Sequence, residues 1–110
     1  MAHGAAEHGG CFYEVNEYTF ELVGKRGSGD SADLSLYIKD PRLQPVTTGD
    51  VILQVTEAEG KVTDKAMRIG SDKAFHLTAD FRRRGRYRTR AQLKLPGGKL
   101  LKCPLSLLLP

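Results

Sequence analysis

The stretch GRYRTRAQLKL, residues 85–95, alternates small or apolar residues with charged or polar ones. Successive side chains of a β-strand point to opposite faces, so this pattern predicts a strand with one buried and one exposed face. The expected inward residues are Tyr87, Thr89, Ala91, Leu93 and Leu95, and the expected outward residues are Arg86, Arg88, Arg90, Gln92 and Lys94. A slip of one residue would bury the polar set, so the register of this strand is strongly specified.

The same period of two recurs along the chain and is broken by glycine and proline, and no long amphipathic helix is indicated. Further strands are expected at residues 11–15, 18–23, 33–40, on either side of Ala58-Glu59-Gly60 within 51–70, at 74–81, and after a turn at Gly97-Gly98. About seven to eight short strands with regular turn signals predict an all-β fold, an antiparallel immunoglobulin-like β-sandwich. In that fold Tyr87 has two readings: a corner residue whose hydroxyl bonds to upstream backbone, or a plain core tyrosine.

The length of 110 residues predicts one domain. We expect a flexible N-terminal segment at residues 1–10 and a single β-sandwich domain over residues 11–110. No stretch approaches the roughly 20 apolar residues of a membrane span, so no transmembrane segment is expected. No signal peptide is visible, which leaves a cytosolic protein or a mature form without its leader.

Charge is unevenly distributed along the chain. Residues 1–55 hold four basic and eight acidic side chains, and residues 56–110 hold thirteen and five, which makes the net charges −4 and +8. Arg86, Arg88 and Arg90 share the exposed face of their strand at intervals of roughly 7 Å. This is a candidate interaction face, and its alternative is a solvated strand surface. Nucleic acid is not the expected ligand, because Tyr87 points to the opposite face and single-strand binders interleave aromatics with the charges.

The first eleven residues concentrate the side chains that ligate metals. His8 and His3, with Cys11 if it is reduced, are the candidate ligands of copper or zinc. Gly9-Gly10 would let the chain fold back so that His8 and Cys11 reach one ion. The alternative is a leader that binds no metal.

The two cysteines offer a second prediction. Cys11 and Cys103 fall in the first and the last expected strands, which can be neighbours in a sandwich. A disulfide between them would close a loop of about 90 residues and stabilise the fold by about 4–5 kcal/mol in the chain-entropy model. The alternative is two unrelated, partly buried thiols.

Other residues with catalytic chemistry fit structural roles better. His76, between Phe75 and Leu77, is interpreted as a surface or hydrogen-bonded histidine, and the loop aspartates as turn residues. No serine has the context of a nucleophile, and the stretch GKRGSGDS (24–31) lacks the order of a phosphate-binding loop. We therefore expect no enzyme.

Three segments, EHGGCFYEVNEYTFELV (7–23), LYIKD…PVTTGDVILQV and GRYRTRAQLKLPGGK, together resemble a family of small β-sandwich domains. These domains occur near the N-terminus of periplasmic adaptor subunits of heavy-metal efflux pumps and as short stand-alone periplasmic proteins. The resemblance implies a periplasmic location with a removed leader, a role in heavy-metal handling, and an efflux-pump or other periplasmic partner. Metal binding carries over to His8 alone, and Cys11 departs from the small or apolar residue expected there.

Two further functions stay open beside this one. The first is a protein-interaction module without metal that docks through a sheet edge or through the face of Arg86, Arg88 and Arg90. The second is a cytosolic nucleic-acid binder.

Overall fold

The computed structural model describes residues 11–15, 17–57, 59–83 and 85–109, with backbone alone for the first of these ranges. Eight strands account for most of them: β1 (Cys11–Val15), β2 (Tyr18–Arg26), β3 (Ser31–Lys39), β4 (Asp50–Thr56), β5 (Val62–Ile69), β6 (Phe75–Asp80), β7 (Gly85–Lys94) and β8 (Leu100–Leu109). The described ranges contain no apolar helix of the length that a bilayer crossing needs.

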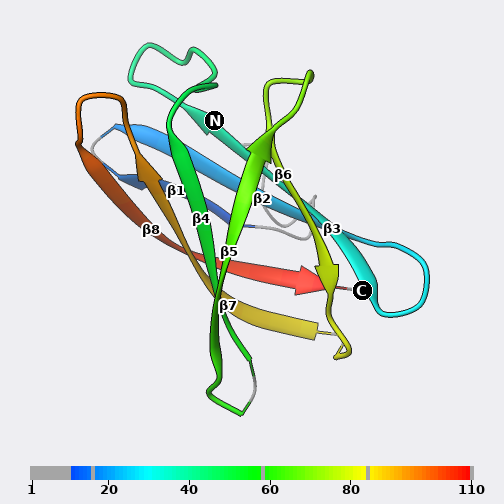
Figure 1. Ribbon diagram of the computed structural model, residues 1–110. Helices are drawn as coiled ribbons and strands as arrows, with labels where there is room; N and C mark the ends of the chain where they lie inside the picture. Colours follow the sequence, from blue (N-terminus) through cyan, green and yellow to red (C-terminus); the bar gives the residue numbers. More distant parts are fainter. Residues whose placement is uncertain (1–10, 16, 58, 84, 110) are drawn as a thin grey trace.

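The strands form one antiparallel sheet in the order β1-β2-β3-β6-β5-β4-β7-β8. β1 and β2 also contact β8, so the sheet curls until its two ends meet and nearly closes as a barrel (Figure 1). The predicted all-β antiparallel class is confirmed. An immunoglobulin-like sandwich of two separate sheets is not, because β5 pairs with β4 along most of its length and then with β6 at Arg68 and Ile69. This change of partner joins the two halves.

The register predicted for β7 is confirmed. Tyr87, Thr89, Ala91 and Leu93 are buried, and Leu95 packs against the core just beyond the strand. Thr89 is tolerated inside because its hydroxyl donates to the carbonyl of Leu105 on β8, 3.0 Å away. The barrel interior is filled by the inward residues of β2 to β8, including Phe20, Leu36, Leu53, Phe75, Leu101 and Leu107.

The turns are tighter than the sequence predicts in one place. The polar stretch between the strands predicted at 18–23 and 33–40 is mostly strand, because β2 runs to Arg26 and β3 begins at Ser31. The backbone N–H of Gly27 donates to the carbonyl of Ser31 at 2.8 Å, and Gly29 supplies a positive φ of 59°. The predicted strand boundary is too early because glycine and polar residues are typical of loops, whereas Gly24 lies inside β2 against the leucines of β8.

The turn at Gly97-Gly98 is confirmed. Both glycines have φ near 100°, a conformation that other residues rarely adopt, and the N–H of Gly98 donates to the carbonyl of Leu95 at 2.9 Å. This turn fixes β8 against β7 along their whole length, from Lys94 opposite Leu100 to Gly85 opposite Leu109.

Candidate functional site

The predicted metal ligands fall at the start of the chain. His3, His8 and the side chain of Cys11 lie outside the described residues, so the copper or zinc site stays a prediction. The backbone of Cys11 opens β1 opposite Leu22 of β2, which ties the end of the histidine-containing segment to the barrel. From residue 17 onward, the described side chains form no cluster of three or more metal-ligating residues.

The predicted disulfide also stays a prediction, because the Cys11 side chain lies outside the described residues. Cys103 is fully buried in β8, and β1 packs beside β8. The two strands expected to carry the bond are therefore neighbours, as the sequence argument requires.

His76 is held by hydrogen bonds at both ring nitrogens. Its Nδ1 lies 3.0 Å from the hydroxyl of Ser35, its cross-strand partner on β3, and its Nε2 lies 2.8 Å from Oδ1 of Asp72. The expectation of a surface, hydrogen-bonded histidine is confirmed. Donation from the His76 ring, together with the backbone N–H of Ala74, lowers the pKa of the Asp72 carboxyl below its ordinary value of 3.8.

The expected interaction face is the outer face of β7. Arg86, Arg88 and Arg90 are all exposed, and they alternate with the buried residues Tyr87 and Thr89. We call these three arginines the β7 arginine strip. Nη1 of Arg86 donates a hydrogen bond to the hydroxyl of Ser106 on β8 at 3.1 Å.

The cross-strand neighbours of the β7 arginine strip are uncharged. On β4 they are Thr56 beside Arg88 and Gln54 beside Arg90. On β8 the neighbours are Leu108, Ser106 and Pro104. Among residues 17–57, 59–83 and 85–109 the ion pair within 4 Å is that of His76 and Asp72, so no carboxylate there lies within ion-pairing distance of the strip. Its positive charges therefore add along one face.

Hydrogen bonds from two side chains, Tyr87 and Arg26, hold the start of β7 in place. The Tyr87 hydroxyl donates to the carbonyl of Arg83 at 2.8 Å, which confirms the bond to upstream backbone that the corner reading predicts. Arg26 of β2 donates to the carbonyls of Phe81, Arg83 and Asp30 at 2.5, 3.3 and 3.2 Å. Sequence reasoning missed Arg26, because a basic residue next to a polar loop carries no signal of a long-range contact.

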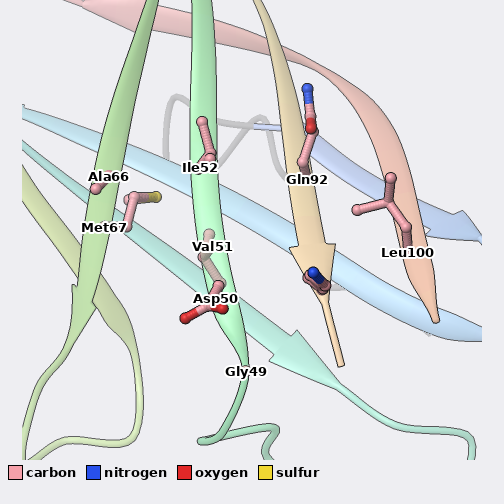
Figure 2. A pocket seen from close by; sticks show the side chains of 9 residues that line it. Gly49, Asp50, Val51, Ile52, Ala66, Met67, Gln92 and Leu100 are labelled. Carbon is pink, nitrogen blue, oxygen red and sulfur yellow. The ribbon is translucent and has the colours of Figure 1, made fainter. Parts of the chain in front are cut away.

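The outer face of the sheet has two hollows, one beside Arg88 and Arg90 of β7 and one beside Gln92 and Lys94. The hollow beside the strip has a volume of about 310 Å³ and is lined by Gln54, Thr56, Arg88, Arg90 and Pro104, among others. A larger one, about 550 Å³, lies further along β4 and β7, with Asp50, Ile52, Ala66, Gln92, Lys94 and Leu100 on its walls. Figure 2 shows these side chains arriving from four strands, β5, β4, β7 and β8.

The larger hollow was not found from the sequence. Its signal was present in the alternation of β4, where inward Val51, Leu53 and Val55 leave Ile52 on the outside. The neighbours of Ile52 on other strands depend on strand pairing. The register places Ala66 on one side of it and Gln92 on the other.

A scan against protein-family models, a search of curated proteins and a search of solved structures found no match for this chain.

Proposed function

We propose that this chain is a non-enzymatic interaction module that binds an acidic segment of a partner protein through the β7 arginine strip. The observation that carries this proposal is the row of Arg86, Arg88 and Arg90, exposed on one face with uncharged neighbours on both adjacent strands. Guanidinium groups pair with carboxylates in bidentate geometry, and an unneutralised row attracts an acidic partner from a distance.

The face is better suited to docking than the edge of the sheet at β8. Pro104 lies in the middle of this last strand and has no N–H to offer an added strand. β1 and β2 also pack beside β8 and cover part of it. An incoming strand would therefore find this edge interrupted, whereas the arginines on the face are open.

Charge reversal tests the proposal. We expect Arg88→Glu/Arg90→Glu to weaken binding of a fluorescent glutamate-rich peptide by tenfold or more in an anisotropy titration, and binding by the unchanged protein to fall with added salt. The matched control is Arg82→Glu/Arg83→Glu, which changes charge equally at exposed positions outside the strip. Equal losses in both variants, no peptide binding by the unchanged protein, or tighter binding of an oligonucleotide than of the peptide would contradict the proposal.

A second candidate function is heavy-metal handling in the periplasm, with copper or zinc at His8, His3 and Cys11 and an efflux-pump subunit or another periplasmic protein as the partner. It rests on the resemblance of the Glu7-to-Gly10 segment, which stands directly before β1. Titration with Cu(I), Cu(II) or Zn(II) should shift the NMR resonances of residues 2–15 at stoichiometric metal. Unmoved resonances would contradict it.

We also propose that the barrel is a variant of the immunoglobulin-like Greek key. The spatial runs β2-β3-β6-β5 and β4-β7-β8 correspond in chain order to the strand runs ABED and CFG of that fold. The Tyr87 hydroxyl bond near the start of β7, the counterpart of strand F, supports the same assignment. An experimental structure whose β5 pairs with β4 alone, with no ladder to β6, would contradict it.

A further inference from the structure

The larger hollow lies on the same outer face as the β7 arginine strip, and this inference rests on the function proposed for the strip. Ile52 and Leu100 stand on its walls with 38% and 49% of their surfaces exposed, and Ala66 is exposed beside Ile52. Apolar side chains around a surface hollow are typical of a site that takes an apolar group.

The charges at the hollow differ from those at the strip. Lys94 is the one cation on its wall, and the carboxylate-bearing Asp50 is its direct cross-strand neighbour on β4. Opposite charges at this end offset one another, whereas the strip has no such partner. The lining of the hollow is thus apolar with balanced charges, whereas the strip is basic.

β7 runs through both halves and sets their separation. Gln92 and Lys94 lie at the hollow, and Arg88 and Arg90 lie at the strip, four residues away. Four residues of strand span roughly 13 Å. An extended segment lying along β7 has the same rise, and its residues i, i+4 and i+6 point to the same side.

We infer that the partner segment is an extended acidic peptide that places an aliphatic side chain in the hollow and carboxylates four and six residues away on the β7 arginine strip. Exposed Asp50 and Asp64 stand on the same outer face. A flat anionic bilayer would cover these carboxylates together with the arginines, whereas an extended peptide along β7 places its own carboxylates at the β7 arginine strip alone, which favours the peptide.

Three fluorescent peptides of equal length and charge test this inference. The first carries leucine at position i and glutamates at i+4 and i+6, the second replaces leucine by alanine, and the third moves the leucine to i+1, which turns its side chain away from the face. We expect the first to bind about tenfold more tightly than the second, the effect of burying one leucine side chain, and the third to bind like the second.

Variants of the hollow complete the test. The variant Ile52→Ser should remove the preference for leucine and leave binding of the alanine peptide unchanged. Leu100→Ser, for which we expect the same result, serves as the second variant if the first fails to fold. The control is Ile69→Ser. This isoleucine of β5 is similarly exposed but does not line the hollow, so the variant should keep the preference for the leucine peptide.

The outcomes separate the two proposals. Equal binding of the three peptides would overturn this inference and leave the acidic partner standing. Absence of binding to any of them would overturn both. Tighter binding to phosphatidylserine vesicles than to the peptides would also overturn both, because the face would then be a lipid-binding surface.

Discussion

At the scale of single residues, the start of β7 depends on a few polar contacts. The carbonyl of Arg83 accepts from the Tyr87 hydroxyl and from Arg26, which joins the segment before β7 to β2. The Tyr87 ring also meets Phe81 edge to face, with centroids 5.3 Å apart. These contacts orient the strand that carries the arginine strip.

The Tyr87 hydroxyl can be removed without disturbing the ring. We expect Tyr87→Phe to lower the free energy of unfolding by about 1 kcal/mol, because one hydrogen bond of a largely buried residue is lost and the contact with Phe81 stays. Tyr37→Phe is the control, since Tyr37 is 41% exposed. Chemical denaturation measures both, and equal stability of Tyr87→Phe and the unchanged protein would contradict the role given to the hydroxyl.

The Asp72 carboxyl gives a prediction of pH dependence. Its pKa is lower in the folded protein than the ordinary 3.8, chiefly because the His76 ring donates to it. This contact therefore contributes stability that is fully present above the unfolded-state pKa and is lost as the pH falls through the folded-state pKa. Carboxyl-carbon NMR should show the lowered pKa.

Two variants identify the cause of that shift. In His76→Ala the pKa of Asp72 should rise toward 3.8, although the N–H of Ala74 still donates to it. In Ser35→Ala it should stay low, because Ser35 contacts the other nitrogen of the ring. An unchanged Asp72 pKa in His76→Ala would show that the ring is not the main cause.

At the scale of elements, the approach of β2 to β8 is set by a glycine. A Cβ at Gly24 would lie 2.8 Å from Cδ1 of Leu107 and 2.8 Å from Cδ2 of Leu109, both buried. A side chain at this position would force both leucines to move, so the glycine leaves room for them where the barrel closes. The local sequence, a glycine beside Lys25 and Arg26, hides this role because it reads as the start of a loop.

Substitution at Gly24 should therefore destabilise the fold. We expect Gly24→Val to cost about 1–3 kcal/mol of unfolding free energy through overpacking, measured by denaturant titration. Gly27→Ala is the control, because its Cβ would have ordinary contacts of 3.5 Å or more. Combining Gly24→Val with Leu107→Ala should cost less than the sum of the two changes, and strict additivity would contradict a direct clash.

At the scale of the whole molecule, the sheet brings the two ends of the strand order together. β1 and β8 stand at opposite ends of that order and yet pack side by side (Figure 1). A bond between Cys11 and Cys103 would staple this junction. The closed arrangement also mixes the acidic and basic halves of the chain, because β4 pairs with β7.

A count of free thiols tests the disulfide between Cys11 and Cys103. Protein produced in an oxidising compartment and then denatured should show no reactive thiols, and reduction should lower its unfolding free energy by about 4–5 kcal/mol. Cys11→Ser, which cannot form the bond, should expose one thiol and lose stability to a similar degree. Two reactive thiols in the oxidised, denatured protein would contradict the disulfide.

Much of the fold was predictable from the alternation of residues. The strands, the Gly97-Gly98 turn and the inward set of β7 follow from local patterns, because the pleat of a strand sends alternate side chains to opposite faces. The outward direction of the β7 arginine strip follows in the same way. The metal ligands were predicted from residue type, from the flexibility of Gly9-Gly10 and from a resemblance, and their side chains fall outside the described residues.

Local alternation was enough to locate most of the strands, to identify the buried face of β7, and to show that three arginines stand in a row. The extension of β2 to Arg26, the joining of the two halves by β5, the place of Gly24 against β8, and the hollow between Ile52 and Leu100 required the folded structure. The reason is physical. Alternation is a property of one strand, whereas these features depend on which strands pair and in what register, and residues far apart in the chain set that pairing.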